Sequence, residues 1–290
     1  MLRSDFADAR ASEAELAHFS GTAAQAPAAI ILAAGAGSRL RGDDAFAPPK
    51  PLQPVAGVPL IQRTLSTFAQ AGVREAVVVL GCEFDRIRAG IDEIADAVDI
   101  DVTITRNHRW ERGNSTSVLA AAEHVGDRFF LAMSDHLFEP TFLDLLQEAD
   151  QGAALSLIVD RHWEAVPDVD EATKVRLEEN QIVDIGKEIP VFDAVDTGVF
   201  LCRPALFEAV RITQQSGDFT LSGAVQHLIP QGDAIAVPSH GLFWQDIDTP
   251  EDLALAEQRL AALDELGGDW PLHATPDRAA IASRGAPPIP

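Results

Sequence analysis

The sequence has little cysteine and little positive charge, and each scarcity excludes a class of protein. Its two cysteines, Cys82 and Cys202, are too few for a disulfide scaffold or a zinc site, which favours a reducing cytoplasm. Lysine and arginine number 22 against 45 aspartate and glutamate residues, a formal net charge of −23 at pH 7. So acidic a chain argues against nucleic acid or an anionic membrane as a partner. Any anionic substrate must therefore meet a few placed cations rather than a general positive field.

Long apolar runs are also missing. None approaches the roughly 20 residues of a membrane-spanning helix. The first six residues lack the basic start and apolar core of a signal peptide. At 290 residues the chain is long enough to bury a sizeable core. We therefore expect a cytoplasmic globular protein with one large α/β domain or two small ones, and with neither a membrane nor a nucleic-acid partner.

The most informative stretch is a glycine-rich turn that follows an apolar run at residues 28–33. The run reads as a buried strand, and Gly35 and Gly37 let the backbone bend and expose successive N–H groups to an anion. Arg39 adds a cation, and Lys50 can reach the same place from the far side of a flexible segment. A strand, a glycine-rich turn and two cations predict a polyphosphate site. The residues assigned to it are Leu32, Ala33, Ala34, Gly35, Gly37, Ser38, Arg39 and Lys50.

Two common phosphate motifs do not fit this stretch. A P-loop needs a lysine directly after its last glycine, and a dinucleotide fingerprint needs a third glycine where Leu40 stands. The stretch instead resembles the signature of nucleotidyltransferases with a glycosyltransferase-A-like fold. That signature is Leu-Ala-Ala-Gly-x-Gly-x-Arg-Leu followed by Pro-Lys-Pro-Leu, and both pieces occur here, at residues 32–40 and 49–52. The alternative, a glycine-rich turn with incidental charges, requires two separated matches to arise by chance.

Strand and helix signals alternate through the first half, which predicts a parallel sheet flanked by helices. The predicted helices there are residues 59–72, 83–98 and 115–125, and the strands are 75–81, 100–105 and 128–133. In the second half the signals predict an antiparallel hairpin at 172–186, a strand at 194–202, helices at 205–210 and 221–229, and a last sheet segment at 241–248. Thr249 is expected to cap a final helix that starts at Pro250.

These signals and the resemblance together predict a three-layer αβα, Rossmann-like nucleotidyltransferase fold. Its central sheet is expected to be mainly parallel, with the antiparallel hairpin on the acceptor side. The predicted organisation is an N-terminal extension at residues 1–26, a nucleotidyltransferase domain at 27–265 and a loose tail at 266–290.

Carboxylates at strand ends predict a magnesium site. Asp135 follows a buried strand, where open parallel sheets place their ligand crevice, and Mg²⁺ commonly takes one or two protein carboxylates besides phosphate and water. Asp246 or Asp248 can supply the second ligand, and the resemblance to the family segment Asp/Asn-x-Asp/Asn-Thr-Pro-Glu-Asp favours Asp246. The alternative makes Asp248 a turn residue and Asp246 a solvated strand end. His136 either contacts phosphate or lines the crevice.

The resemblance also implies where the base and the acceptor bind. The family segment that matches residues 106–117 contacts base and ribose, which assigns Gly113, Asn114 and Ser117; alternatively, Asn114 and the hydroxyls after it cap a helix. A family lysine that holds the acceptor's phosphate matches Lys187, although most lysines simply lie at the surface. The remaining acceptor-site candidates are Lys174, Asp196, Thr197 and Gly198.

Several motifs in order narrow the resemblance. Residues 133–136, 171–175, 182–188, 193–200 and 244–249 look like the cytidylyltransferase part of enzymes that form CDP-inositol, and the resemblance spans about residues 28 to 262. It implies CMP transfer from CTP to inositol 1-phosphate with release of pyrophosphate, Mg²⁺ as cofactor, and Arg39, Lys50 and Lys187 as the catalytic cations. No general base is needed, because a phosphomonoester is mostly ionised near pH 7.

Some alternatives stay open. In much of that family a membrane-embedded transferase follows, and none follows here, so the acceptor could instead be a sugar 1-phosphate, phosphocholine or a phosphonate. A non-catalytic nucleotide-binding protein would be expected to lack one of these charged residues. A nucleotide-sugar glycosyltransferase usually carries an Asp-x-Asp motif where this chain has Ser134-Asp135-His136.

Overall fold

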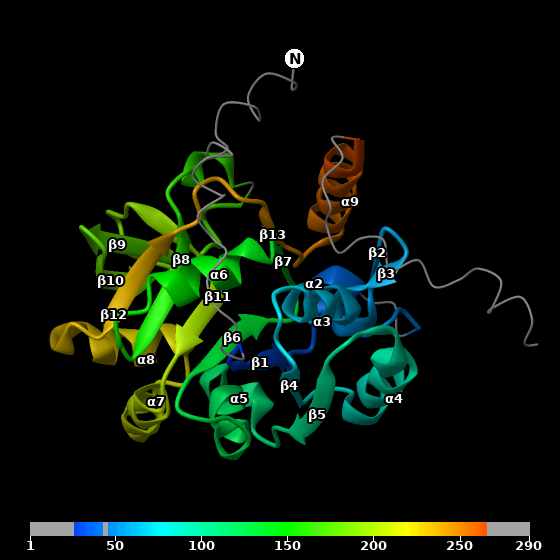
Figure 1. Ribbon diagram of the computed structural model, residues 1–290, viewed down its shortest axis with the longest axis horizontal. Helices are drawn as coiled ribbons and strands as arrows, with labels where there is room; N and C mark the ends of the chain where they lie inside the picture. Colours follow the sequence, from blue (N-terminus) through cyan, green and yellow to red (C-terminus); the bar gives the residue numbers. More distant parts are fainter. Residues whose placement is uncertain (1–25, 43–45, 167, 266–290) are drawn as a thin grey trace, which may run out of the picture.

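The computed structural model describes residues 26–42, 46–166 and 168–265, which fold around one mixed β-sheet with helices on both faces (Figure 1). The sheet of this described part has nine strands in the order β5-β4-β1-β6-β11-β8-β12-β10-β9. All run in one direction except β10 and β11. Their bounds are β1 (Ala28–Ala33), β4 (Glu75–Leu80), β5 (Asp101–Arg106), β6 (Phe129–Met133), β8 (Leu155–Asp160), β9 (Lys174–Glu178), β10 (Gln181–Gly186), β11 (Ala194–Cys202) and β12 (Ala234–Pro238).

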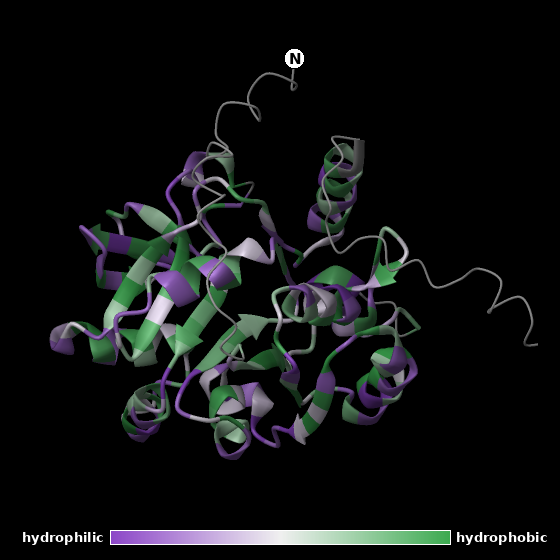
Figure 2. Ribbon diagram, viewed as in Figure 1, coloured by the Kyte–Doolittle hydropathy of each residue, from purple (hydrophilic) through white to green (hydrophobic). Residues whose placement is uncertain are grey.

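The parallel first half brings the two predicted site segments to one edge of the sheet. β1 lies between β4 and β6, and Leu32 is in register with Met133. The amide of Ser134 donates to the carbonyl of Leu32 at 3.0 Å, so the turn after β1 and the acidic segment after β6 start side by side. Apart from the exposed Glu75 that begins β4, these strands are apolar, because both faces of the sheet are covered (Figure 2).

Alternate residues of each central strand point to opposite faces and define two cores. One contains Ile31, Phe130 and the buried side of α3 (Leu60–Gln70), α4 (Phe84–Ile94) and α6 (Thr141–Glu148). The other contains Ile30, Phe129 and residues of α5 (Ser115–Ala120), α7 (Ala205–Gln215) and α8 (Leu221–Leu228). Two helical layers therefore enclose the sheet, and the predicted three-layer α/β fold is confirmed.

A third, smaller core supports the site. It joins Leu40 of α2 (Ser38–Arg41) to Val55 of β2 (Pro54–Val55), Ile247 and two residues of α9 (Pro250–Glu265). The predicted cap of this last helix is confirmed, since Thr249 Oγ1 accepts from the amide of Asp252 at 3.2 Å and Asp252 Oδ2 accepts from the amide of Thr249 at 2.8 Å. Through this core, helix α9 packs with both α2 and the segment that carries Asp246 and Asp248.

The structure differs from the sequence-based expectation at several elements. The predicted last sheet segment does not join the central sheet, because β13 (Trp244–Asp246) pairs instead with β7 (His136–Phe138). Strands β8 and β12 and helix α6 were not predicted, and α7 is five residues longer than the predicted helix. The predicted extension, except Ala26, and the predicted tail lie outside the described residues. Within the described ranges, no helix combines the length and the apolar character needed to cross a bilayer.

Candidate active site

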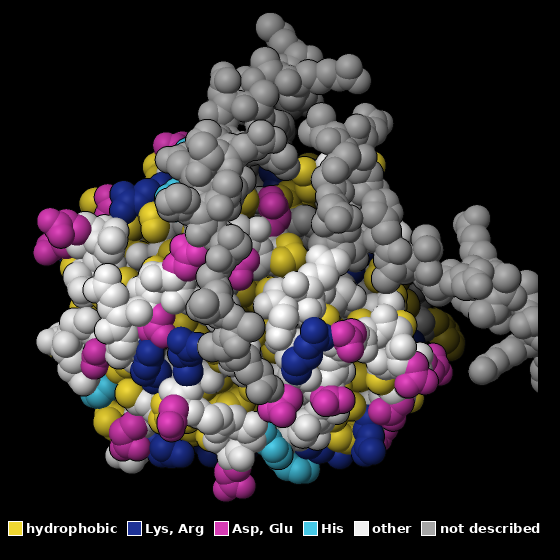
Figure 3. Space-filling view, viewed as in Figure 1, with side chains coloured by type: hydrophobic (Ala, Val, Ile, Leu, Met, Phe, Trp, Pro, Cys, Tyr) yellow, Lys and Arg dark blue, Asp and Glu magenta, His cyan; other side chains and the backbone are white. Residues whose placement is uncertain are grey.

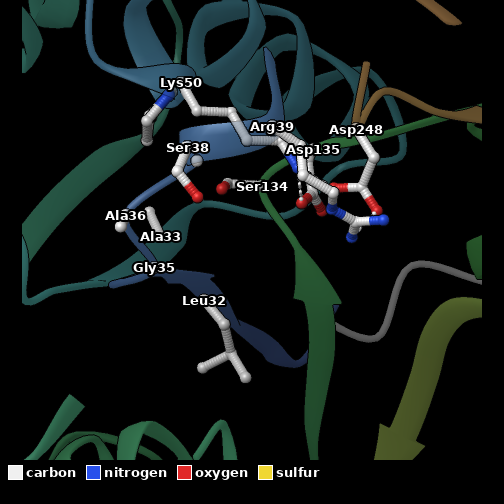
Figure 4. A pocket seen from close by; sticks show the side chains of 12 residues that line it. Leu32, Ala33, Gly35, Ala36, Ser38, Arg39, Lys50, Ser134, Asp135 and Asp248 are labelled. Carbon is white, nitrogen blue, oxygen red and sulfur yellow. Dashed lines mark hydrogen bonds and ion pairs between the residues drawn. The ribbon is translucent and has the colours of Figure 1, made fainter. Parts of the chain in front are cut away.

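A cavity of about 280 Å³ opens at the carboxyl ends of the central strands β1 and β6 (Figure 4). It gathers segments that lie far apart in the sequence, and Figure 4 shows the side chains of Lys50, Arg39, Asp135 and Asp248 directed toward one another. The lining residues are Leu32, Ala33, Gly35, Ala36, Gly37, Ser38, Arg39, Lys50, Pro51, Ser134, Asp135 and Asp248. The structure thus brings together most of the residues that the sequence analysis assigned to the polyphosphate site.

The two glycines of the turn differ in what surrounds them. Gly37 has φ 60°, and a Cβ there would lie 2.4 Å from Lys50 Cβ, so only glycine lets the lysine stem cross the turn. Around Gly35, by contrast, no atom lies within 4 Å of the position of a Cβ. One glycine therefore makes room for a cation, and the other leaves the backbone open to a ligand.

Carboxylates of the protein hold both cations of the cavity. Lys50 is only 8% exposed, pairs with Asp135, and places Nζ 2.5 Å from Asp248 Oδ1. Burial alone lowers the pKa of Lys50, but attraction to the two carboxylates outweighs it and leaves that pKa above the ordinary value. Arg39 is half exposed and donates to Asp248 Oδ2 at 2.6 Å. An anion that enters the cavity would therefore compete with the carboxylates of Asp135 and Asp248 for Lys50 and Arg39.

Asp135 and the segment after β13 meet through the backbone. The amide of Ile247 donates to the carbonyl of Asp135 at 3.0 Å, and Asp246 stands opposite His136 in the β7–β13 pair. Burial raises the pKa of Asp135, but the attraction of Lys50 and His136 outweighs burial and leaves that pKa below its ordinary value. This carboxylate is therefore ionised. Burial and the neighbouring acids Asp248 and Asp135 hold the pKa of Asp246 above its usual range, against the opposing effect of His136.

Asp248 and Asp246 lie differently with respect to the cavity, and the choice of Asp246 as the second metal ligand, made from the sequence, stays a prediction. Asp248 lines the cavity and shares Lys50 with Asp135, whereas Asp246 is absent from the lining. Among the described residues, no three side chains of His, Cys, Asp or Glu converge on one metal position. A Mg²⁺ ion that arrives with a triphosphate needs no such group, because one or two carboxylates suffice beside phosphate and water.

His136 connects Asp135 to β11. Its Nδ1 lies 2.7 Å from the carbonyl of Thr197 and must donate there, while Nε2 lies 3.6 Å from Asp135 Oδ1. Gly198 has φ 76°, and a Cβ there would lie 2.3 Å from His136 Nδ1, so glycine makes room for the ring. Burial lowers the pKa of His136, but the surrounding acids, Asp135 first, raise it above the usual value.

The predicted acceptor residues are not all available to a ligand. Lys187 is half exposed and pairs with Glu171 Oε2 at 3.2 Å, and this same oxygen lies 3.9 Å from Arg39 Nη1. Thr197, in contrast, is fully buried and donates its hydroxyl to the carbonyl of Ile158 at 2.9 Å. The carboxylate of Glu171 therefore lies between Lys187 and Arg39, which lines the cavity. The hydroxyl of Thr197, in contrast, is already bonded to a neighbouring strand of the sheet.

Asp196 and Lys174 are also bound within the protein. Asp196 Oδ1 accepts from the amide of Gly198 at 2.7 Å, and burial raises the pKa of its carboxyl to about 6. Lys174 is buried, and its ammonium donates to main-chain carbonyls. Glu171, which bridges Arg39 and Lys187, was missed by the sequence analysis, because no local signal indicates a partner so distant along the chain.

The residues predicted to contact the base lie outside the cavity lining. A Cβ on Gly113, where φ is 145°, would lie 2.3 Å from the carbonyl oxygen of Phe219. Asn114 does not cap its own helix α5; its Oδ1 accepts from the amide of Leu221, the first residue of α8, at 2.8 Å. Ser117 is 3% exposed and accepts from Asn107 Nδ2 at 2.9 Å. Contact of these residues with a base stays a prediction.

The fold and the cavity together define the class of protein. Residues 29–214 match the MobA-like NTP transferase domain, and the chain belongs to this family. Membership implies a nucleoside triphosphate as one substrate. On the face seen in Figure 3, Lys and Arg side chains form only small groups among the Asp and Glu side chains.

Two relatives within this group of nucleotidyltransferases are similar to the chain over most of its length. The chain is 37% identical over 249 residues to the bifunctional IPC transferase and DIPP synthase of Rubrobacter xylanophilus, a match that covers 84% of this chain and 54% of that protein. It is 30% identical over 247 residues to the UTP–glucose-1-phosphate uridylyltransferase AglF of Haloferax volcanii, covering 80% of this chain and 96% of that protein. The chain thus spans about half the length of the bifunctional relative and nearly all of the uridylyltransferase.

A solved structure has the same architecture. The inositol-1-phosphate CTP transferase from T. maritima superposes with a TM-score of 0.70 at 25% identity, covering 84% of this chain and 98% of that chain. The resemblance to this group of nucleotidyltransferases, predicted from the motifs, is confirmed by these matches.

Proposed function

We propose that the protein transfers a cytidylyl group from CTP to inositol 1-phosphate and releases pyrophosphate. The observation that carries this proposal is the cavity at the end of β1. There an open glycine turn, two cations and two carboxylates face one space. The likeness to an inositol-1-phosphate CTP transferase along nearly all of that chain supports the choice of CTP and of inositol 1-phosphate.

The chemistry needs alignment and charge rather than a general base. An oxygen of the acceptor's phosphate attacks the α-phosphorus of CTP, a new P–O bond forms, and the bond from the α-phosphorus to the bridging oxygen of pyrophosphate breaks. That attacking phosphate is mostly ionised near pH 7, since its second pKa is about 6. The turn at residues 35–38, Arg39 and Lys50 would bind the triphosphate, and Lys187 the acceptor's phosphate. Positioned cations of this kind stabilise the charge that develops on the phosphates.

Asp135 and Asp248 are the residues that would hold Mg²⁺. Both offer hard oxygen ligands, both line the cavity, and both already face one positive charge, the ammonium of Lys50. When bound with the nucleotide, Mg²⁺ supplies positive charge against the phosphate oxygens. Asp246, the ligand chosen from the sequence, would then lie outside the cavity lining, opposite His136, and would not itself bind the metal.

The substrates can be tested by measuring pyrophosphate release. The assay crosses the four nucleoside triphosphates with inositol 1-phosphate, glucose 1-phosphate, phosphocholine and aminoethylphosphonate. CTP with inositol 1-phosphate should give the highest kcat/KM. The nearly full-length match to a UTP–glucose-1-phosphate uridylyltransferase makes UTP with glucose 1-phosphate the second candidate, and a maximum at that pair would overturn the proposal.

The metal ligands can be tested with three matched variants. Asp135→Asn and Asp248→Asn should each lower turnover by roughly 10² to 10³, the loss typical of one electrostatic partner in a transition state, and should raise the Mg²⁺ concentration at half-maximal rate. Asp246→Asn should change both quantities much less. Equal losses in Asp246→Asn and Asp248→Asn would contradict the preference for Asp248.

A further inference from the structure

Lys174, at the start of β9, is a buried lysine whose ammonium contacts main chain. The residue is 8% exposed, and Nζ donates to the carbonyls of Asp170 at 2.9 Å, Lys187 at 2.8 Å and Ala172 at 3.5 Å. An ammonium has three donors, so these carbonyls use all of them. Within the described residues no carboxylate forms an ion pair with Lys174. Such a cation is fully satisfied by the backbone around it.

The carbonyls come from two segments on either side of the β9–β10 hairpin. Asp170 and Ala172 precede β9, and Lys187 follows β10, where Lys174 is in register with Gly186. Nζ also lies 5.9 Å from the centre of the Phe192 ring, within the range of a cation–π contact. The buried ammonium therefore fastens the two open ends of the hairpin together.

Both side chains that connect the acceptor side to the cavity are carried by these fastened segments. Glu171 lies in the chain between Asp170 and Ala172, whose carbonyls accept from Lys174, and Lys187 itself provides the third accepting carbonyl. Their side chains meet at 3.2 Å, and Glu171 also faces Arg39 at 3.9 Å. Because both side chains are more than half exposed, this pair is readily exchanged for a ligand, unlike the charge-assisted hydrogen bonds of Lys174.

We propose that Lys174 is a positioning residue for Lys187: it clasps residues 170–172 to the backbone of Lys187, so that the Lys187 ammonium faces Arg39 and the cavity. This inference rests on the function proposed above, in which Lys187 binds the acceptor's phosphate. It replaces the prediction from the sequence that Lys174 itself contacts the acceptor, because contact with a ligand would break the three backbone hydrogen bonds.

The test compares Lys174→Met, Lys187→Met and the double variant. Methionine keeps an apolar stem and removes the ammonium. Lys174→Met should raise KM for the acceptor by about tenfold, equivalent to 1.4 kcal/mol, with a smaller change in kcat and no change in KM for the nucleotide. Hydrogen exchange in residues 168–173 and 186–189 of the free protein should become faster in Lys174→Met and not in Lys187→Met.

The double variant separates positioning from direct contact. If Lys174 acts through Lys187, KM of the double variant should equal that of Lys187→Met, whereas two direct contacts would multiply their effects. Arg161→Met is the matched control, since Arg161 is an exposed cation that donates to the carbonyl of Glu179 at the turn of the same hairpin, 3.2 Å away. It should leave KM and exchange unchanged.

Each remaining outcome decides one claim. Wild-type KM and wild-type exchange in Lys174→Met would overturn the clasp, as would multiplied effects in the double variant. If Lys174→Met does not fold, Lys174→Gln, which keeps two donors, should show a smaller rise in KM and in exchange. A wild-type protein that releases no pyrophosphate with any acceptor would refute the proposed function, while the exchange measurement would still test the clasp.

Discussion

Replacing Gly37 by alanine tests how the phosphate turn and Lys50 depend on each other. Gly37 has φ 60° and ψ 30°, a left-handed conformation that costs alanine about 1–2 kcal/mol. The added Cβ would lie 2.4 Å from Lys50 Cβ, which belongs to the fixed base of the side chain, so backbone must shift. Overpacking of this kind adds about 1–3 kcal/mol. The expected loss of unfolding free energy is therefore about 2–5 kcal/mol, from those two sources together.

Activity should fall more than stability alone explains. Moving the stem of Lys50 displaces an ammonium that is held between Asp135 and Asp248, and misplacing one charged partner costs roughly 10² to 10³ in turnover. Gly232→Ala is the matched control. Gly232 has φ 70° and ψ 19°, and the nearest atom to its Cβ position is 4.0 Å away. It should lose only about 1–2 kcal/mol and keep wild-type turnover.

Thermal unfolding and pyrophosphate release measure the two effects separately. For a domain of this size, each kcal/mol lowers Tm by about 2–4 °C, so Gly37→Ala should melt clearly below Gly232→Ala. Equal melting temperatures of the two variants, together with wild-type turnover in Gly37→Ala, would refute the claim that Lys50 crosses the turn only because Gly37 has no side chain.

Three further predictions concern residues that the sequence analysis assigned to the acceptor and the base. Burial raises the pKa of Asp196 from 3.8 to about 6, so the stability that its protonated form contributes is complete below pH 4 and lost as the pH rises through 6. Asp196→Asn should therefore gain about 1–2 kcal/mol over wild type above pH 6 and little near pH 4, by urea unfolding at both pH values; parallel profiles would contradict this. Gly113→Ala should lose about 3 kcal/mol or more, since its Cβ meets the Phe219 carbonyl, and wild-type urea stability would disprove that approach. Ser117→Ala should cost about 1 kcal/mol through the lost Asn107 hydrogen bond, and an added rise in KM for the nucleotide would indicate contact with the base.

The part of the site that could be predicted from the sequence is the part that depends on parallel strands. An apolar run identifies a buried strand, and the residues after it lie at its carboxyl end. For this reason the turn at residues 35–39 and Asp135 were expected at one edge, where Ser134 and Leu32 are now joined by a hydrogen bond. The order of the sheet could not be predicted in the same way, because β8 and β12 enter between β11 and β10 through contacts between distant segments.

The direction of individual side chains was harder to predict than the position of their segment. Asp246 and Asp248 are two residues apart in one motif, but Asp246 ends β13 opposite His136, whereas Asp248 lies beyond the strand and lines the cavity. Lys174 and Lys187 look alike in the sequence as lysines near a hairpin. The structure separates them, because one ammonium meets three carbonyls and the other meets a single exposed carboxylate.

Lys50, Lys174 and Lys187 are all the lysines that the sequence contains, and their unequal accessibility has a practical consequence. The first two are 8% exposed and bonded on several sides, while the side chain of Lys187 is 52% exposed. A limiting dose of an amine-acylating reagent should therefore modify Lys187 before the others. Peptide masses after digestion would then report occupancy of the acceptor side directly, without a labelled substrate or a coupled assay.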